Sequence, residues 1–534
     1  MPINCLVYCR SFKGADAGVV GRFLQTALNI SLDSGGRPVW ISKSRGDRVA
    51  KVKFADGISM TEISPLIEGK LSFKEELLKC ESVNTDDAAT SEEQQVKRQK
   101  KNLSIEEICL PWIQKPYDDQ LSEKRQVVVD ALDSALAGVK KQAKSRGYHP
   151  LPEWSSLRID KTIHVPGSQL GYRNKCEFTM GLNSAGEPDV GFMYARATKS
   201  MEHIVEPGET LMHVSERISE IIVSFRAFLR LNVEKYCLFS HVTKTGYWRM
   251  MSLRACPTTG QSQVLVQLGS VESQVEKTDI EKLLTVWGKE AGLTSLYIQY
   301  NGSLTDTIVM SPEHEMKLIF GSESILMGIG SELKLKVHPL SFFQTNTHGC
   351  DLLYSTVSDW CGIGESNTRI FDVCCGVGSI GQFIAKKNSG QVEIVGVDIV
   401  EEAILNAEEN ARLNEIEAAC KYVAGRAETV LPDLINQHGP DSKPICIVDP
   451  PRVGLHKTVI KAIRDNENIK KLIYVSCNPK SMAEDLVKFC EPLTSSPEED
   501  GIAVNARFVP IRAVAVDMFP NTIHCEVVVL LERS

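Results

Sequence analysis

The chain has 534 residues, of which 43% are hydrophobic and 24% are charged, and its formal net charge is −8. That length exceeds one ordinary hydrophobic core and predicts about two to four domains. No segment reaches the ~20 consecutive apolar residues that span a bilayer. The acidic balance excludes a global nucleic-acid signature, so RNA binding would need a local basic surface.

The N-terminus and the cysteines indicate the compartment. The first residues lack the basic and apolar regions of a secretory signal, and they are not Arg-rich as transit peptides are. Sixteen cysteines are scattered without a C-x-x-C pair or a spacing typical of zinc or iron–sulfur ligands. We therefore expect the cytosol or the nucleus rather than the mitochondrion, no membrane partner, and neither a metal ion nor an iron–sulfur cluster.

Residues 1–80 predict a small α/β domain. Strands are expected at 5–8, 39–42 and 49–54, and helices at 18–28 and about 64–67. With one later strand, this β-α-β-β-α-β order resembles an RNA-recognition-motif (RRM) fold. Where such domains carry base-stacking aromatic residues, this sequence has Val7, Val49 and Lys51. Weak RNA binding and protein binding therefore remain as alternatives.

Residues 81–102 change in composition, from an acidic stretch to the basic run Lys97–Lys101. This composition predicts a flexible charged linker. The basic run is either a nuclear-import signal, a phosphate contact or an ordinary solvated charge run.

Residues 103–330 form a mixed central region. The pattern is helical from Leu103 to about Leu136, and strands are expected at 172–178, 263–268 and 295–300. Residues 245–249 combine a turn with Tyr247, Trp248 and a base. Such a group suits base stacking and phosphate contact as well as it suits core packing.

Residues 331–534 alternate strands and helices. Strands are expected at 369–374, 393–397, 444–448, 472–475, 507–516 and 524–532, and a helix at about 401–413. This order predicts an α/β, Rossmann-like, doubly wound sheet that is mainly parallel and ends in an antiparallel pair.

Three strand ends carry candidate ligand-binding residues, because ligands bind at the carboxyl edge of such a sheet. A turn with Gly376 and Gly378 lets the backbone approach a ligand at a helix N-terminus. Asp398 follows the second strand and can accept hydrogen bonds from ribose hydroxyls. The third strand ends in Asp449-Pro450-Pro451-Arg452. The set suits S-adenosylmethionine better than a dinucleotide, a choice that rests partly on the resemblance described below. Amine methyltransferases usually have Tyr or Phe where this sequence has Arg452, which leaves room for carbon chemistry.

A cysteine follows the strand at 472–475. Cys477 lies between Ser476 and Asn478, and Pro479 ends the strand. Its place at the carboxyl edge of the sheet makes it a candidate nucleophile, with a buried structural thiol as the alternative.

These motifs resemble the tRNA (uracil-5-)-methyltransferase family, with the greatest similarity to its animal "homolog A" type, over about residues 103–534. The resemblance rests on the motifs at 111–112, 116–117, 172–178, 342–347, 449–452, 476–479 and 524–526. It implies that Cys477 attacks carbon 6 of uracil, that carbon 5 takes the methyl group of S-adenosylmethionine, and that Glu526 then removes the proton from carbon 5.

The resemblance also implies binding roles. The S-adenosylmethionine site would include Gln344, Asp398 and Asp449, with Cys374, Gly376, Gly378 and Ser379 in the glycine turn. The substrate would be uridine 54 of the tRNA T-loop, flipped out of its stack. The candidate RNA contacts are Lys175, Lys244, Tyr247, Trp248 and Arg452. A uridine of ribosomal RNA or mitochondrial tRNA, and a non-catalytic RNA-binding or tRNA-folding factor, are the alternatives.

Overall fold

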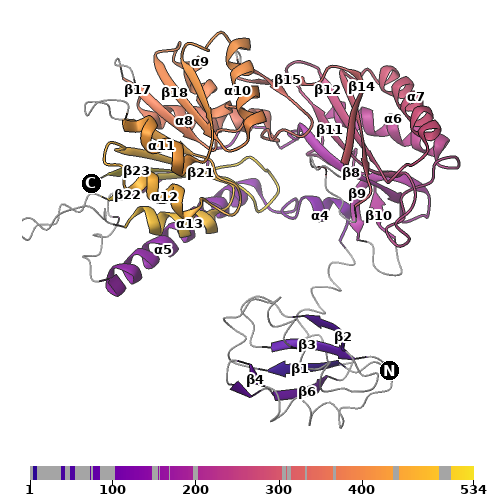
Figure 1. The fold of residues 1–534 in the computed structure, drawn as a ribbon, viewed down its shortest axis with the longest axis horizontal. Coiled ribbons are helices and arrows are strands. Elements are labelled where there is room, and N and C mark those ends of the chain that lie inside the picture. The colour runs from indigo at the N-terminus through magenta and orange to yellow at the C-terminus, as the bar shows by residue number, and fades with distance from the viewer. Residues whose placement is uncertain are drawn as a thin grey trace, which may run out of the picture. The chain divides into compact units, whose positions relative to one another are not determined.

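The computed structural model divides the chain into two compact units, Met1–Leu103 and Ser104–Ser534 (Figure 1). In the first unit it describes the strands, Leu24 and Leu103. In the second it describes everything except residues 147–153, 155–156, 168, 197–201, 304–307, 309–313, 331–332, 365–367, 437–443, 492–506 and 534.

The first unit contains a four-stranded antiparallel sheet. Its strands in spatial order are β2 (Pro38–Ser42), β3 (Val49–Phe54), β1 (Asn4–Tyr8) and β6 (Lys79–Val83), and β4 (Ser72–Phe73) and β5 (Glu76–Leu77) form a separate hairpin. The predicted strands at 5–8, 39–42 and 49–54 are confirmed. The linker prediction is wrong at residues 81–83, which belong to β6. The rest of the linker, with Lys97–Lys101, lies outside the described residues, as do the predicted helices except Leu24, which is helical and buried.

An eight-stranded sheet forms the centre of the C-terminal part of the second unit. Its strands in spatial order are β19 (Cys420–Ala424), β18 (Val392–Asp398), β17 (Thr368–Val373), β20 (Ile445–Val448), β21 (Lys471–Ser476), β23 (Glu526–Arg533), β22 (Phe508–Val516) and β7 (Arg158–Ile159). The strands from β19 to β21 are parallel, and β23 runs antiparallel to β21 and β22. The predicted doubly wound sheet with an antiparallel pair is confirmed.

Helices cover both faces of this sheet (Figure 1). One face packs against α8 (Thr347–Cys361), α9 (Ser379–Lys387) and α10 (Glu401–Leu413), and the other against α5 (Tyr117–Arg146), α11 (Ala427–Asn436), α12 (Lys457–Arg464) and α13 (Pro479–Phe489). Side chains alternate along a strand, so Ile370 of β17 belongs to the first core while Phe371 and Val373 belong to the second.

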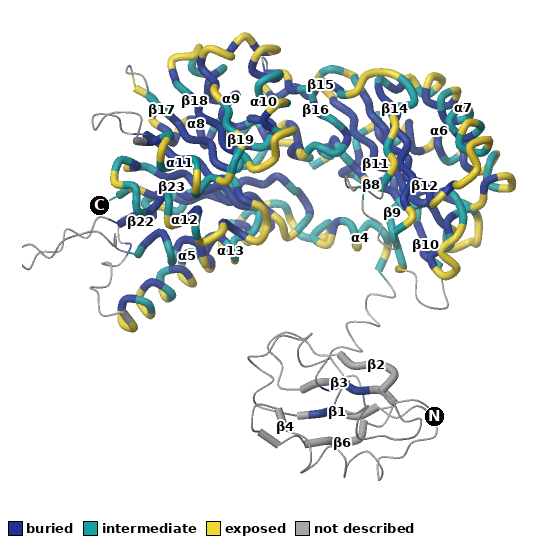
Figure 2. Tube along the Cα trace, viewed as in Figure 1, coloured by how far each residue is buried: buried dark blue, intermediate teal, exposed yellow. Residues whose placement is uncertain are grey.

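A second sheet lies in the central region. Its strands in spatial order are β10 (Ile204–Glu206), β9 (Pro188–Ala195), β8 (Lys175–Leu182), β11 (Trp248–Ala255), β12 (Ser262–Leu268), β13 (Ser295–Asn301) and β14 (His314–Gly321). One face of this sheet packs against α6 (Glu216–Asn232) and α7 (Gln274–Glu290) through a single apolar core. The middle strands are buried along their whole length, as the dark blue in Figure 2 shows.

The helix predicted from 103 to 136 is wrong in its extent. It is two helices, α4 (Ile105–Cys109) and α5, separated by a segment that contains Pro111 and Pro116, which interrupt helical hydrogen bonding. Since α5 packs on α13 and β7 pairs with β22, this N-terminal part of the predicted central region belongs to the eight-stranded sheet. No described helix is both long enough and apolar enough to cross a membrane.

The hairpin of β15 (Ile325–Ile329) and β16 (Leu333–Val337) follows the central sheet and packs into the core with α8. The edge of β16 is held by two buried asparagines, one in α10 and one at the C-cap of that helix. Asn410 and Asn414 exchange hydrogen bonds of 2.7 to 3.4 Å with the backbone of Lys336 and Lys334. These amides satisfy a strand edge that would otherwise be left unpaired in the core.

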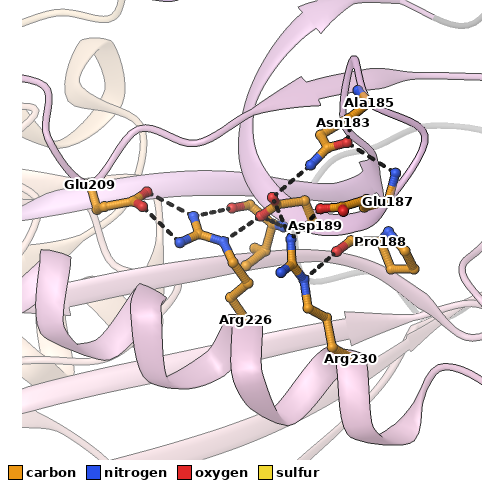
Figure 3. A network of polar contacts seen from close by, with 9 residues as sticks. Asn183, Ala185, Glu187, Pro188, Asp189, Glu209, Arg226 and Arg230 are labelled. Atoms are coloured by element: carbon orange, nitrogen blue, oxygen red, sulfur yellow. Dashed lines mark hydrogen bonds and ion pairs between the residues drawn. The ribbon is translucent and has the colours of Figure 1, made fainter.

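A buried polar network joins α6 to the turn between β8 and β9 (Figure 3). Arg226 donates to both carboxylate oxygens of Glu209, at 2.7 Å each, and to Asp189 at 2.5 Å. Arg230 reaches Glu187 and Asp189 from the next turn of the helix. Burial would raise the pKa of Glu209, but its hydrogen bonds to Arg226 hold that pKa below its ordinary value.

We expect Arg226→Met to lower the free energy of unfolding of this region by about 3 kcal/mol, because it leaves the buried Asp189 carboxylate without its closest counter-charge. Because the pKa of Glu209 is depressed in the folded protein, its interaction with Arg226 contributes stability that is lost as the pH falls through that depressed pKa. The destabilisation caused by Arg226→Met should therefore be smaller in acid. Urea unfolding, followed by the fluorescence of the buried Trp248 and Trp287, measures it. Arg230→Met is the matched control: its nearer ion-pair partner Glu187 is 59% exposed, and its contact with Asp189 is longer, at 3.4 Å, so a change below about 1 kcal/mol is expected.

Candidate active site

Cys477 lies between β21 and α13, at the carboxyl edge of the parallel strands, and is half-buried. The Ser476 hydroxyl accepts a hydrogen bond from the Asn478 N–H (3.0 Å) and closes the turn around the thiol. Asn478 caps α13 by accepting from the Lys480 N–H (3.2 Å), and Pro479 occupies the first helical position. The thiol therefore stands on a rigid turn rather than on a free loop.

The Asp-Pro-Pro-Arg loop lies beside this turn. Val448 and Tyr474 are neighbours in the pairing of β20 with β21, so both loops leave the sheet at the same edge. The Asn478 side chain donates to the Arg452 carbonyl (2.8 Å) and ties the two loops together. Asp449 begins the loop where β17 and β20 are adjacent, which is the point where strand order reverses in a doubly wound sheet.

Antiparallel pairing brings Glu526 to the same edge. Ser476, the last residue of β21, pairs with Val527 of β23. One step further in that register, Cys477 faces Glu526, the first residue of β23, which is only 3% exposed. The fold thus places two residues 49 positions apart in the sequence next to one another, and the effect of the Glu526 carboxyl group on the pKa of Cys477 is consistent with that proximity.

The charges around the thiol oppose one another. Burial raises the pKa of Cys477, and the carboxyl groups of Glu526 and Asp449 raise it further, whereas the charge and hydrogen bond of Arg452 lower it. Arg452 is itself exposed to solvent. It is the cation that favours the thiolate, which is the nucleophilic form of a cysteine.

The two carboxyl groups are also perturbed. Burial raises the pKa of Glu526 well above its ordinary value, and Asp449 adds to this effect while Arg452 opposes it. Burial, with a contribution from Asp372, raises the pKa of Asp449 to about 7. Clustered carboxyl groups with raised pKa values are typical of sites where a proton is held or moved.

The loop before Glu526 is braced by α5 and the segment in front of it. Lys124 and Asp517 form a fully buried ion pair of 2.6 Å, and Lys124 also donates to the Phe519 carbonyl. Gln120 and Asn521 exchange two hydrogen bonds of 2.9 Å, with Asn521 in the left-handed region at φ +64°. Glu526 is therefore positioned by residues some 400 places earlier in the chain.

The glycine turn between β17 and α9 has the space that a ligand needs. A Cβ atom at Gly376 would meet nothing within 4 Å, whereas one at Gly378 would lie 2.6 Å from the Tyr422 hydroxyl. Gly378 is at φ +78° and caps α9, and Cys374 is also in the left-handed region, at φ +64°. Burial raises the pKa of Cys374 to about 12, so its thiol stays protonated and contributes shape and backbone groups.

Two aspartates flank this turn. Asp398, the last residue of β18, accepts hydrogen bonds of 2.9 Å from the N–H groups of Gly376 and Val400. Asp372 is completely buried, and one oxygen accepts from Gly381 (3.0 Å), while the other has no hydrogen-bond partner among the described residues. Burial raises the pKa of Asp372 to about 7. Sequence reasoning missed Asp372, although an acid within an otherwise apolar strand was the available signal.

Helix α8 contacts the turn, and the predicted cofactor residue Gln344 lies in the segment just before this helix. Gln344 is 5% exposed, and its carbonyl accepts a hydrogen bond from the Asn174 side chain (2.9 Å). The Tyr354 hydroxyl lies 2.8 Å from the Ser379 hydroxyl, and burial raises the pKa of Tyr354, with Cys350 and Asp449 adding to the shift and the hydrogen bond to Ser379 opposing it. Tyr354 is a second residue that the motifs did not reveal, because it comes from a helix outside them.

The candidate RNA contacts do not form one group. Lys175 lies beside Arg254 in the pairing of β8 with β11, whereas Lys244 and Tyr247 precede β11 and lie at its other end, roughly 20 Å away at the rise of a strand. Lys244 is exposed, and Tyr247 packs against Tyr236. The prediction that Trp248 contacts RNA is wrong. Its ring is fully buried against Phe225 and Phe228, so it belongs to the core and cannot stack on a base.

The open glycine turn, the strand-end Asp398 and the buried, half-satisfied Asp372 fit the ribose and the amino-acid end of S-adenosylmethionine. A family model described as a methyltransferase domain matches residues 364–484, which contain all three. The class of protein is therefore an S-adenosylmethionine-dependent methyltransferase.

The comparisons define the family. A model described as tRNA (Uracil-5-)-methyltransferase matches residues 441–534. The chain is 30% identical over 451 residues to tRNA (uracil-5-)-methyltransferase homolog A of Mus musculus, covering 80% of this chain and 69% of the relative. It is 32% identical over 370 residues to homolog B of the same species, covering 68% and 72%. This chain belongs to the tRNA (uracil-5-)-methyltransferase family.

A solved structure has a similar fold. The Pyrococcus abyssi tRNA (uracil-54, C5)-methyltransferase, in complex with S-adenosyl-L-homocysteine, superposes with a TM-score of 0.52 at 23% sequence identity, covering 78% of this chain and 83% of that one.

Proposed function

We propose that this enzyme methylates carbon 5 of a uridine in tRNA through a covalent adduct with Cys477, and that Glu526 is the base. The observation that carries the proposal is the juxtaposition of Cys477 and Glu526 across the β21–β23 register. A nucleophile and a buried carboxyl group at the same sheet edge as the cofactor turn supply the groups that this reaction requires.

The reaction proceeds by addition and elimination. The Cys477 thiolate attacks carbon 6 of uracil, which shifts an electron pair to carbon 5 and makes that carbon nucleophilic. S-adenosylmethionine supplies the methyl group. The Glu526 carboxylate then removes the proton from carbon 5, the double bond re-forms, and the thiolate leaves carbon 6. Asp449, with a pKa of about 7, can hold or accept a proton at the uracil edge.

The proposed substrate is uridine 54 in the T-loop of tRNA. The Pyrococcus abyssi enzyme of similar fold is named for that nucleotide, and the two Mus musculus relatives are named for tRNA. A stacked uridine cannot reach a half-buried thiol at a sheet edge, so the target must be flipped out. Lys175, Lys244, Tyr247 and Arg452 are the proposed RNA contacts, on two ends of the central sheet and beside the thiol.

The N-terminal unit is proposed to be an RRM-like accessory domain of a cytosolic or nuclear enzyme. The strand order β2-β3-β1-β6 supports this, because β1 and β3 occupy the two central positions expected of the β-α-β-β-α-β order.

Mapping 5-methyluridine by mass spectrometry in tRNA and ribosomal RNA tests the proposal. In a strain that lacks the enzyme, restoring the wild-type gene should return 5-methyluridine to the T-loop, and restoring Cys477→Ala should not. A methyl group restored only in ribosomal RNA, or nowhere, would contradict the proposed substrate.

The rate of methyl transfer should rise with pH through the neutral range and continue to rise in the alkaline range, because the pKa values of both the Cys477 thiol and the Glu526 carboxyl group are raised and both must be ionised in turn. Arg452 lowers both values, so Arg452→Gln should move the profile to higher pH and slow turnover at neutral pH by about tenfold. Turnover at saturating RNA measures this. Lys480→Gln, which removes an exposed lysine from the start of α13, should leave the profile unchanged. An unchanged profile in Arg452→Gln would refute the assignment.

A further inference from the structure

A pocket of about 420 Å³ lies between the central sheet and the segment that leads into α8. It is separate from the glycine turn, the Asp-Pro-Pro-Arg loop and Cys477, none of which lines it. Its lining combines cations with aromatic rings, and the residues that matter here are Arg173, Lys175, Phe192, Arg254, Phe342 and Thr345.

Arg254 is the unusual member of this lining. It stands on β11, next to Lys175 of β8, and is only 3% exposed. One terminal nitrogen donates to the Ser341 carbonyl (2.9 Å), but Nε and Nη1 have no hydrogen-bond acceptor among the described residues. Burial lowers the pKa of Arg254 to about 10, with Glu177 opposing the shift, so the guanidinium stays charged at neutral pH.

The pocket therefore has an excess of positive charge. Glu177 is the carboxylate in its lining, and it forms an ion pair of 2.9 Å with Lys175. Arg173 and Arg254 lack such a partner among the described ion pairs. A buried guanidinium with unmade hydrogen bonds is costly, and an anion that entered the pocket would relieve that cost. The Thr345 hydroxyl, which has no hydrogen-bond partner in the described part of the chain, offers a further donor.

Phe342 adds a stacking surface. Its side chain is 75% exposed, although the neighbouring Phe343 is buried. Phe192 lines the same pocket and is half-buried. Exposed aromatic rings next to arginines are what single-stranded RNA needs, since bases stack on the rings while the phosphates meet the cations.

We propose that this pocket binds a second, unstacked nucleotide of the RNA substrate, with its phosphate at Arg254 and Arg173 and its base against Phe342. This inference rests on the proposed function, since it assumes an RNA substrate. The pocket is lined by Phe342, Phe343 and Thr345, which lead into α8, and Tyr354 of that helix hydrogen-bonds with Ser379 at the end of the glycine turn. A nucleotide held there would anchor the strand from which the target uridine is flipped.

The proposed contact between the Arg254 charge and a phosphate can be tested by equilibrium binding. A T-arm RNA is titrated onto the full chain at several NaCl concentrations, with S-adenosylhomocysteine present. Arg254→Gln should weaken binding at least about tenfold and reduce the slope of log Kd against log salt by about 1, the signature of one lost phosphate contact. Arg254→Lys should recover most of the slope. Lys317→Gln, which removes a cation from β14 outside the pocket, should change neither quantity.

Backbone-neutralised RNAs locate the phosphate. In a set of T-arm RNAs that each carry one methylphosphonate, one position should weaken binding to the wild-type protein but have no further effect on Arg254→Gln. If every position affects both proteins equally, or if Arg254→Gln loses S-adenosylhomocysteine affinity along with RNA affinity, Arg254 is a structural brace and the proposal is wrong.

Phe342→Ala provides a second test of the proposal, and this test does not depend on changing a buried residue. Its exposed ring carries no core packing, so the variant should fold normally, bind RNA about tenfold more weakly and keep the wild-type salt slope. Unchanged RNA affinity would remove the stacking role. These readouts measure binding alone, so they stand apart from the mapping of 5-methyluridine, which tests the proposed reaction.

Discussion

Cys477→Ala should abolish the formation of 5-methyluridine, with a loss of at least about 10⁴-fold, the scale seen when a covalent nucleophile is removed. Without addition of a thiolate to carbon 6, carbon 5 of uracil has no electron pair to offer to a methyl donor. Binding of S-adenosylhomocysteine should be unchanged, because the glycine turn, Asp398 and Gln344 do not involve this thiol. Incorporation of labelled methyl groups into a T-arm RNA, with calorimetry for the cofactor product, measures both.

Trapping makes the same experiment more specific. RNA with 5-fluorouridine at the target has no proton on carbon 5 to remove, so wild-type protein should stay bonded to it and survive denaturing electrophoresis, whereas Cys477→Ala should not. Cys237→Ala is the matched control, since that thiol is exposed and lies in the central region. An adduct of normal yield with Cys477→Ala would assign the nucleophile elsewhere.

The residues at the parallel strand ends were predictable from the sequence for a physical reason. Apolar runs at 369–374, 393–397, 444–448 and 472–475 are too short for helices, and helices separate them, so a parallel sheet is the natural outcome. Once the strands are parallel, the residues that follow them share one edge. Gly376, Asp398, Asp449 and Cys477 lie together on that account.

Glu526 could not be placed in this way. It begins a strand that runs in the opposite direction, so its position relative to Cys477 depends on the pairing of Ser476 with Val527. No local pattern fixes a register between strands that are far apart in the chain. The family resemblance implied that Glu526 acts together with Cys477, and the antiparallel pairing of β21 with β23 is what brings the two residues to the same edge.

The remaining residues depended on tertiary packing. The residues around Trp248 in the sequence suited RNA stacking, but helix α6 covers the Trp248 ring. Arg254 sits in a strand whose alternation places it on the face opposite α6 and α7, where it meets the segment before α8. Neither outcome can be read from neighbours in sequence, because both are set by which element lies across the sheet.

Glu526→Gln should separate the two halves of the reaction. The amide cannot take the proton from carbon 5, so we expect one methyl transfer per active site followed by a stalled covalent protein–RNA adduct, with steady-state turnover reduced by about 10² to 10⁴-fold. The amount of methyl transferred in the first turnover should match the number of active sites. Rapid quenching, followed by denaturing electrophoresis and mass spectrometry of the adduct, measures the burst and its persistence.

The stability of Glu526→Gln should show that its loss of turnover is not caused by unfolding. The pKa of Glu526 is raised in the folded protein, and an acid of that kind costs stability as the pH rises above its ordinary value. A neutral amide of the same shape removes that cost, so Glu526→Gln should unfold at the same temperature as wild type or higher at neutral pH. Glu532→Gln, at the far end of β23 and 47% exposed in its side chain, is the control and should turn over normally. A folded Glu526→Gln that releases methylated RNA at the wild-type rate would show that another group takes the proton.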